Sequence, residues 1–345
     1  MVFAEKLKAW QKLHGRRGLP WQGTRDPYRI WLSEVMLQQT QVSAVIPYYE
    51  RFLRRFPTVE ALAAASEDEV LQLWSGLGYY ARGRNLHAAA KTVSQLGSFP
   101  RTAADIEALP GIGKSTAAAI AAFAFGERAA ILDGNVKRVL ARHFGIAGWP
   151  GEKAVQDTLW KRANRLLPKT DIETYTQALM DLGATVGVRT PKCDACPVSR
   201  GCVARKTDRT SAIPAPRPRK ALPQKAVTWL LLHDRGQILL EKRPAPGIWG
   251  GLWSFPEAPP KDVNGHCRRS LGCEVRSRKP LETLEHGFTH FRLRIHPLLC
   301  QVTRKPEAQS TRSLWIDVQD VFEAAVPTPV RTLVRRLNGI RRFSR

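Results

Sequence analysis

Residues 109–140 read LPGIGKSTAAAIAAFAFGERAAILDGNVKRVL, a glycine-rich turn between two helical patterns followed by a single acidic residue, Asp133. Gly111 and Gly113 allow positive φ in the turn and let the backbone approach another surface closely. Ser115 begins an alanine-rich helix whose free N–H groups form an anion site, and a DNA phosphate is its natural ligand. Taken alone, Gly-x-Gly is more often an ordinary tight turn, but the spacing to Asp133 favours a nucleic-acid enzyme.

The composition points to a large, basic protein with a polyanionic partner. The chain has 345 residues, enough for two or three domains, and a formal net charge of +24. Such an excess of positive charge suits nucleic acid, although a solvated basic surface is the simpler alternative. The sequence has no apolar run of 18 residues and no signal peptide, so we expect a cytosolic protein without membrane contact. Its six Cys are then not expected to form disulfides.

Two apolar patterns near the N-terminus predict helices over residues 3–14 and 30–40. Glu34 lies inside the second pattern, and no basic residue occurs between positions 30 and 47. A carboxylate in such a place is either a surface charge or a desolvated acid with a raised pKa. The end of this helix carries side chains able to contact base edges or phosphate, namely Gln38, Gln39 and Thr40.

Four motifs in this order resemble the MutY family of adenine DNA glycosylases. They are WLSEVMLQQT at 31–40, GLGYYAR at 76–82, the hairpin of residues 109–114, which resembles a helix-hairpin-helix motif, and LDGNVKRVL at 132–140. The resemblance covers about residues 4–202 closely and 226–300 more loosely.

This resemblance implies a mainly α-helical core followed by an α/β domain. We expect a six-helix barrel with the helix-hairpin-helix over residues 21–130, and an α-helical subdomain with a cysteine-rich metal loop from residues 1–20 and 131–210. A basic, proline-rich linker over 203–225 joins them to a Nudix-like lesion-recognition domain over 226–345; the linker could also follow a phosphate backbone.

The resemblance also implies the chemistry of base removal. Glu34 would protonate N7 of adenine, and Asp133 would stabilise the oxocarbenium-like sugar, directly or as a transient adduct. A water activated by Glu34 would complete hydrolysis, as in retaining glycosidases. Asn135 would orient Glu34 or the sugar-phosphate. Ser115 stands where related endonuclease III enzymes carry a Schiff-base Lys, which predicts a monofunctional glycosylase without a lyase step.

The implied partner is double-stranded DNA with adenine opposite 8-oxoguanine or guanine, processed by a monomer at the bacterial nucleoid in base-excision repair. Leu77 would be an apolar wedge and Tyr79 would stack beside the opposing lesion, since Gly76 and Gly78 favour a protruding loop. Trp21, Gln22 and Gln177 match positions of the adenine pocket in the family. The remaining expected contacts to DNA are Gln38, Gln39, Thr40, Gly111, Gly113, Ser115 and Lys137.

The cysteines Cys193, Cys196 and Cys202 follow the spacing of a metal site. The family pattern has four Cys around a 4Fe–4S cluster, but the first falls near Gly187 or Val188 here. We therefore expect a 4Fe–4S cluster with one usual ligand missing. The alternatives are a non-thiolate fourth ligand, a Cys from the C-terminal half, a three-iron cluster, zinc or no metal. No His occurs between His143 and His233, so we do not expect an imidazole ligand.

The C-terminal part predicts strands over 226–232, 237–242 and 291–300 and a helix over 326–337. Residues 247–256 resemble a Nudix domain, but the stretch that corresponds to its catalytic box has only Asp262 and Glu274, so we expect binding without hydrolysis. The loop that reads the lesion in the family corresponds to Phe288, Thr289 and His290.

Two other functions remain possible from the residues. One is an endonuclease III-like DNA glycosylase with a different base, such as thymine or an oxidised pyrimidine, and lyase activity; Ser115 and the reader domain disfavour it. The other is a non-enzymatic DNA-binding module, in which Glu34 and Asp133 are ordinary surface charges.

Overall fold

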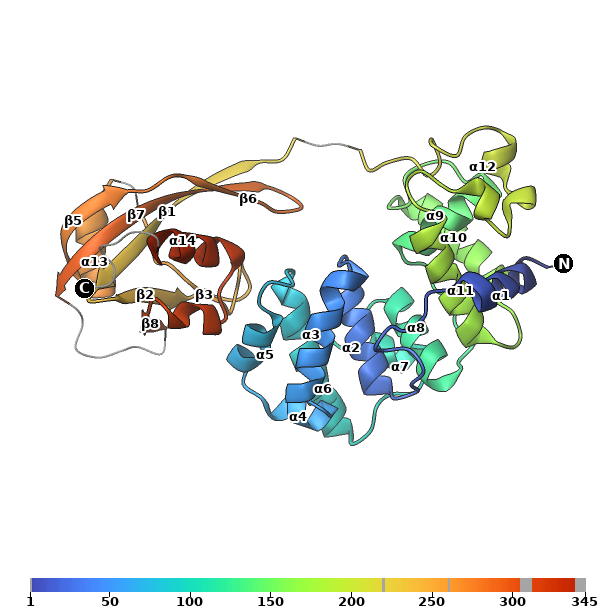
Figure 1. Ribbon diagram of the computed structural model, residues 1–345, viewed down its shortest axis with the longest axis horizontal. Helices are drawn as coiled ribbons and strands as arrows, with labels where there is room; N and C mark the ends of the chain where they lie inside the picture. The colour runs from blue at the N-terminus through green and yellow to red at the C-terminus, as the bar shows by residue number, and fades with distance from the viewer. Residues whose placement is uncertain (1, 219–220, 260, 305–311, 339–345) are drawn as a thin grey trace. The chain divides into compact units, whose positions relative to one another are not determined.

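The computed structural model describes residues 2–218, 221–259, 261–304 and 312–338. By internal contacts the chain forms two compact units. The first consists of residues 1–64 and 85–219, and the second of residues 65–84 and 220–345. The first unit is helical and the second is built on a sheet (Figure 1).

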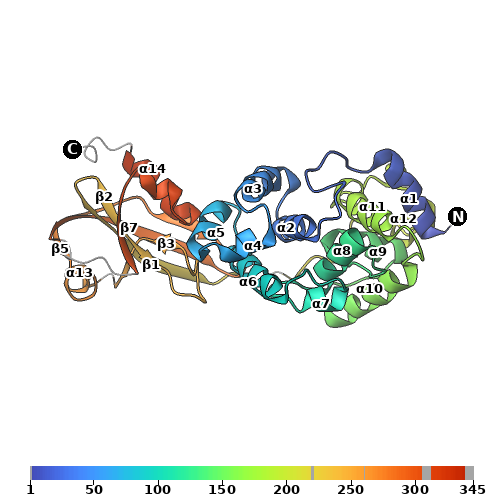
Figure 2. The same ribbon diagram turned by 90° about the horizontal axis from the view of Figure 1, so that it is seen from below.

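The helices of the first unit are α1 (Phe3–His14), α2 (Pro27–Leu37), α3 (Val42–Arg55), α4 (Val59–Ala64), α6 (Tyr80–Leu96, its first turn in the second unit), α7 (Ala103–Glu107), α8 (Lys114–Phe125), α9 (Gly134–Phe144), α10 (Lys153–Leu166), α11 (Ile172–Thr185) and α12 (Val203–Lys206), with the 3-10 turns η1 (Cys193–Ala195) and η2 (Ser199–Gly201). Figures 1 and 2 both show α1 beside α11, and residues of these two helices share one core cluster.

The core of this unit is built around α8. Residues 117–122 of α8 are all buried, because a helix of alanines is apolar on every side and lets its neighbours approach closely. The next helix, α9, begins where the Asp133 carboxylate accepts the N–H of Val136 at 2.8 Å, an N-cap that also fixes this carboxylate in space.

The elements of the second unit are α5 (Glu67–Trp74), β1 (Gln224–Asp234), β2 (Gln237–Lys242), β3 (Trp253–Ser254), β4 (Glu257–Ala258), α13 (Val263–Leu271), β5 (Glu274–Pro280), β6 (Leu284–Gly287), β7 (Arg292–Arg304), β8 (Ser313–Asp317), η3 (Asp320–Glu323) and α14 (Thr328–Asn338). The main path of the sheet is β3-β2-β1-β7-β5, with β1 and β7 parallel and every other pair antiparallel. This mixed sheet and the helical first unit confirm the predicted fold class.

Two details differ from the expectations. The helix predicted to reach residue 40 ends at Leu37, because the chain turns at Gln39, whose φ is +57°. Residues 65–84, expected in the barrel, group by contacts with the C-terminal residues. The finer division of the helical part into a barrel and a subdomain stays a prediction. In the described part of the chain, no helix is long and apolar enough to cross a membrane.

Candidate active site

Two cavities of the first unit share a wall that contains Glu34. One, of about 270 Å³, is lined by Trp21, Gln22 and Gln177 among others. The other, of about 450 Å³, is lined by Asp133 and further polar side chains. The structure thus brings an acid from α2 between a pocket near the size of small-molecule sites and a second polar cavity.

Burial raises the pKa of Glu34 to about 8. Desolvation by burial is the main cause, the negative charge of Asp133 adds to it, and the positive charge of Arg16 opposes it. A carboxylic acid with this pKa is protonated at neutral pH and can donate its proton to a bound base, yet it can also accept one near physiological pH. The raised pKa agrees with the interpretation of Glu34 as a desolvated acid.

A chain of hydrogen bonds fixes the carboxylate of Asp133. The side-chain amide of Asn135 donates to one carboxylate oxygen of Asp133 at 3.0 Å, and Arg138 donates to the side-chain oxygen of Asn135 at 2.8 Å. Arg138 also donates to the backbone carbonyl of Gly183 on α11 at 2.9 Å. Asn135 therefore orients Asp133 directly, whereas the sequence predicted that it orients Glu34 or the sugar-phosphate.

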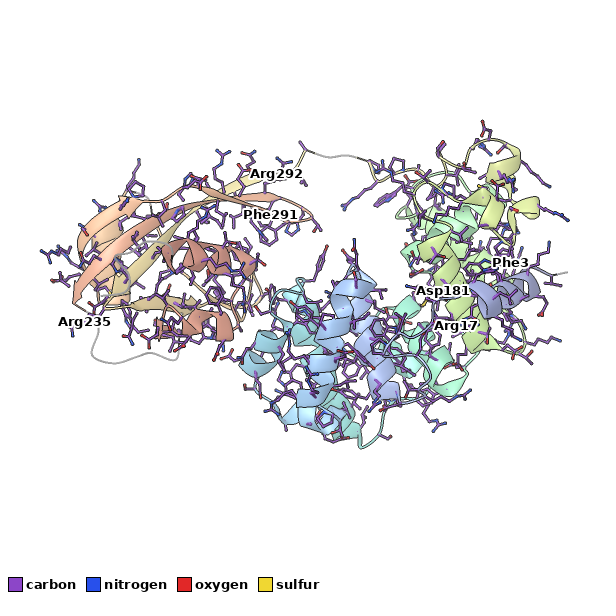
Figure 3. The ribbon with its side chains drawn as sticks, in the orientation of Figure 1. Phe3, Arg17, Asp181, Arg235, Phe291 and Arg292 are labelled. Atoms are coloured by element: carbon purple, nitrogen blue, oxygen red, sulfur yellow. The ribbon has the colours of Figure 1, made fainter. Side chains whose placement is uncertain are left out.

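Sequence reasoning missed a buried carboxylate behind the first cavity. Asp181 is fully buried and accepts the backbone N–H of Arg16 at 3.0 Å and its Nε at 2.7 Å. Asp181 also accepts from Gln177 at 2.8 Å, and Figure 3 marks it on α11 together with Arg17 of the neighbouring segment. An Asp within a helical pattern gives no local signal of this role, because its partner Arg16 lies 165 residues away.

Trp21 and Gln22, which are also expected in the adenine pocket, lie in the wall of the first cavity. Trp21 packs edge-on against Tyr49, with ring centroids 5.3 Å apart. Gln22 donates to the backbone carbonyl of Arg16 at 3.0 Å and accepts the N–H of Leu19 at 3.2 Å. The segment after α1 is therefore folded onto itself, and both side chains line the cavity that contains Glu34.

The glycine-rich hairpin has the expected backbone. Gly111 has φ +76°, and a Cβ there would lie 2.6 Å from the Cβ of Asn85, so only glycine fits. Gly113 caps α8 without a side-chain hydrogen bond and has open space beside it, which leaves the first N–H groups of α8 available to an anion. Ser115 accepts the N–H of Leu132 at 2.8 Å and lines the second cavity, whereas Lys114 lies over the ring of Trp160.

Of the three polar residues after α2, two line the second cavity and one does not. Gln38 donates to the hydroxyl of Thr116 at 3.3 Å, and both Gln38 and Thr40 line the second cavity. Gln39 is exposed and does not line either cavity. Lys137 is partly buried in the first turns of α9 and also lines neither cavity. Contact of Gln39 and Lys137 with DNA stays a prediction.

The loop after α5 exposes Tyr79 and buries Leu77. Leu77 is 7% exposed and Tyr79 is 45% exposed. Gly76 and Gly78 have the positive φ expected of a tight loop, and Tyr79 shares it at +50°. The expectation of a protruding Leu77 is therefore wrong for this conformation, since the turn directs Leu77 inward. The wedge role would require Leu77 to leave its buried position.

An aromatic cluster supports the loop predicted to read the lesion. Phe288 stacks on Phe291 with centroids 4.4 Å apart and contacts His286 and Trp249 at 4.8 and 5.3 Å. Thr289 and His290 are exposed, with the Thr289 hydroxyl 3.4 Å from Nδ1 of His290. Figure 3 marks Phe291 at the start of β7 beside the tip of β6. The loop therefore presents a hydroxyl and an imidazole on a rigid base.

The helix in the place of a catalytic Nudix box has no acidic residue. Its sequence from Val263 to Leu271 is VNGHCRRSL, and Asp262 caps its N-terminus through the N–H of Gly265 at 3.0 Å. Asp262 also pairs with Arg269 at 2.6 Å. This carboxylate is thus occupied by structural contacts, and binding without hydrolysis stays a prediction.

The three cysteines of the predicted metal loop line one small cavity. Cys193, Cys196 and Cys202 share it with Gly187. Gly187 has no side chain to ligate, and a Cβ there would lie 3.1 Å from the Cγ2 of Val139. In the described ranges, no group of three or more His, Cys, Asp and Glu side chains is arranged to hold a metal ion.

His143 lines the same cavity, contrary to the expectation that no imidazole lies near. Its Nδ1 is buried without a hydrogen-bond partner among the residues that the structure describes. The alternative of a borrowed cysteine is wrong, because Cys267, Cys273 and Cys300 are fully buried in the core of the C-terminal domain. Three thiols and one imidazole nitrogen therefore line this cavity beside the Arg142 guanidinium, and thiolates are the usual ligands of iron–sulfur clusters.

Two protein families match successive parts of the chain. Residues 32–165 match the HhH-GPD superfamily of base excision DNA repair proteins, and residues 227–336 match the NUDIX domain. The first match covers helical residues, including residues 65–84 of the second unit, and the second match covers the residues of the sheet.

Relatives match the chain over nearly its full length. An adenine DNA glycosylase of Buchnera aphidicola subsp. Baizongia pistaciae is 36% identical over 98% of this chain and 97% of its own length. The adenine DNA glycosylase of Homo sapiens is 32% identical over 98% of this chain and 74% of its own length. Among solved structures, a thermostable thymine-DNA glycosylase has a TM-score of 0.53 at 30% identity, covering 59% of this chain and 95% of that one. Endonuclease III in a non-covalent DNA complex has a TM-score of 0.50 at 22% identity, covering 60% and 99%, and supports the helical fold alone.

Proposed function

Because the chain belongs to the adenine DNA glycosylase family, we propose that it hydrolyses the N-glycosidic bond of adenine mispaired with 8-oxoguanine or guanine in double-stranded DNA. The observation that carries this proposal is the position of Glu34 in the wall between the two cavities, with a pKa raised to about 8. The extruded adenine occupies the cavity lined by Trp21, Gln22 and Gln177, and its sugar lies on the Asp133 side. Action as a monomer in the cytoplasm, at the nucleoid, stays a prediction.

The chemistry follows from two carboxyl groups with different environments. Glu34 donates its proton to N7 of adenine, which turns a poor leaving group into a good one. The departing base leaves positive charge on the sugar, and the Asp133 carboxylate, held by Asn135, stabilises it electrostatically or through a transient bond. Glu34, now ionised, accepts a proton from the water that attacks the sugar. Such a pair needs one acid kept neutral and one carboxylate kept oriented, and this site supplies both.

The absence of an amine at position 115 supports a monofunctional enzyme. A lyase step requires a Lys amine that attacks the sugar and forms a Schiff base. Ser115 faces the second cavity, and the nearest amine in sequence, Lys114, lies over Trp160 instead. We therefore expect base release without strand cleavage. A glycosylase for a different base is the alternative, favoured by the similarity to a thymine-DNA glycosylase at 30% identity.

For the cofactor, we propose a 4Fe–4S cluster with Cys193, Cys196 and Cys202 as thiolate ligands and His143 as the fourth ligand. His143 replaces the missing cysteine because it lines the same cavity and its Nδ1 has no other partner in the described structure. The positive charge of Arg142 would offset the negative charge of the thiolates. When bound, the cluster would hold the basic loop of residues 186–206 in shape.

Single-turnover base release tests the proposed function. Duplexes pair adenine with 8-oxoguanine, guanine or thymine, and a further duplex pairs thymine with guanine. We expect the wild-type protein to release adenine from the first two, and Glu34→Gln and Asp133→Asn each to abolish release while mismatch binding persists. Glu50→Gln, an exposed residue on α3, is the matched control and should keep full activity. Full turnover in Glu34→Gln contradicts the mechanism, and release of thymine alone favours the alternative.

A further inference from the structure

The helix α5 and the loop that follows it are attached to the C-terminal domain. At the start of α5, Asp68 pairs with Lys242 of β2 at 2.6 Å. Just after its end, the buried hydroxyl of Ser75 donates to the backbone carbonyl of Val326 at 2.9 Å. Arg84 donates to the carbonyl of Gly250. These contacts explain why residues 65–84 form one compact unit with residues 220–345.

Arg331 of α14 completes the junction at Ser75. Its guanidinium donates to the Ser75 hydroxyl through Nη2 at 3.0 Å and through Nε at 3.3 Å, and to the carbonyl of Phe322 at 2.9 Å. Ser75 thus uses its hydroxyl both as a donor and as an acceptor, in a buried place. A buried hydroxyl with both functions satisfied has one favoured position, so this junction fixes the backbone at residue 75 against η3 and α14.

The loop of residues 76–79 is built directly on that fixed point. The carbonyl of Trp74 accepts the N–H of Leu77 at 3.0 Å, and the Trp74 indole donates to the carbonyl of Gly78 at 3.1 Å. Trp74 itself is fully buried. The N–H of Gly76 donates to the Tyr80 hydroxyl at 3.3 Å. Any shift of Ser75 is therefore transmitted to the exposed Tyr79 by short, stiff contacts.

We propose that Ser75 and Arg331 are positioning residues that make the loop 76–79 part of the lesion-reading unit. This inference rests on the proposed function and on the expectation that Tyr79 and the loop of residues 286–290 both meet the base opposite adenine. Because the Ser75–Arg331 junction fixes the loop of residues 76–79 against the compact unit that also carries residues 286–290, it sets the preference for 8-oxoguanine over guanine. The chemistry at Glu34 and Asp133 belongs to the other unit and is left unchanged.

The test compares adenine release from the two mispairs in the full-length protein. The variants are Ser75→Ala, Arg331→Met and the double variant, and Arg335→Met is the matched control. Arg335 lies one turn further along α14, is exposed and contacts the same Phe322 ring, but does not reach Ser75. We expect each single variant to lower the rate ratio of the 8-oxoguanine to the guanine substrate about tenfold, the effect of losing one hydrogen bond to a charged group.

A merely structural role would give a different pattern. It lowers both rates together and keeps their ratio, whereas positioning lowers the ratio and leaves the rate with guanine within about twofold. If the two residues act through each other, the double variant loses no more than either single variant. An unchanged ratio in both single variants overturns the inference, and so does an equal loss in Arg335→Met.

Amide hydrogen exchange separates this inference from the proposed function. We expect Arg331→Met to speed exchange at residues 76–80 of the DNA-free protein, while Arg335→Met leaves it unchanged. If the wild-type protein releases no adenine from either duplex, the proposed function fails, and faster exchange then supports only the attachment of the loop. Unchanged exchange in Arg331→Met shows that the junction does not hold the loop and overturns the inference.

Discussion

Replacing Glu34 with Gln should make the protein more stable at alkaline pH while it abolishes base release. Folding raises the pKa of Glu34 from its ordinary value of 4.5 to about 8, chiefly by desolvation. The folded state therefore holds this proton more tightly than the unfolded state. The free energy of unfolding then falls as pH rises from 4.5 to about 8, and this contribution is constant above that range.

The magnitude follows from the same two values. Each pH unit between them costs about 1.4 kcal/mol of stability, so the ionised Glu34 destabilises the folded protein by about 5 kcal/mol above pH 8. A Gln side chain has nearly the same shape and does not titrate. The stability difference between Glu34→Gln and wild type should thus be near its minimum at pH 4.5 and grow until about pH 8.

Urea unfolding at half-unit steps from pH 5 to pH 9 measures this difference, since effects of all other groups cancel between the two proteins. Asp133→Asn removes one cause of the raised pKa of Glu34. In that background, Glu34→Gln should therefore raise the free energy of unfolding by less than it does in the wild-type protein. Glu50→Gln, on the exposed face of α3, is the control for replacing a surface carboxylate by an amide. A difference between Glu34→Gln and wild type that is equal at pH 5 and pH 9 would refute the reasoning.

Three other predictions concern the same residues and their surroundings. Adenine release should be greatest below pH 8 and fall about tenfold per pH unit above it, because the protonated Glu34 is the acid; a rate that stays constant to pH 9.5 contradicts this role. Gly183→Ala should lower the free energy of unfolding by about 1–3 kcal/mol, since its Cβ would lie 2.5 Å from the Cβ of Asn135. Gly134→Ala, with open space around its Cβ, is the control in chemical unfolding, and equal effects would argue against this packing. Anaerobically purified protein should contain iron with visible thiolate absorption, which His143→Ala loses and the exposed His14→Ala keeps; iron retained in His143→Ala rules out the imidazole ligand.

The sequence by itself determined the local structure and much of the chemistry. The apolar pattern predicted α1 with its observed bounds, and the glycines of the hairpin predicted the turn, because periodicity and positive φ are properties of short segments. The position of Glu34 within an apolar helix indicated either a surface charge or a desolvated acid, and the family resemblance favoured the acid. Asp133 was recognised before α9. The cysteine spacing indicated one shared site for three thiols.

Only the tertiary structure decided which distant residues complete these sites. Asp181 meets Arg16 across 165 positions, and Ser75 meets Arg331 across 256, so no local pattern could pair them. His143 looked remote from the cysteines along the chain, yet α9 brings it into their cavity. The burial of Leu77 likewise depends on how its loop packs, and side-chain burial is a property of the packed fold. Local energies select helices and turns, but the contacts between them determine which polar groups share a site.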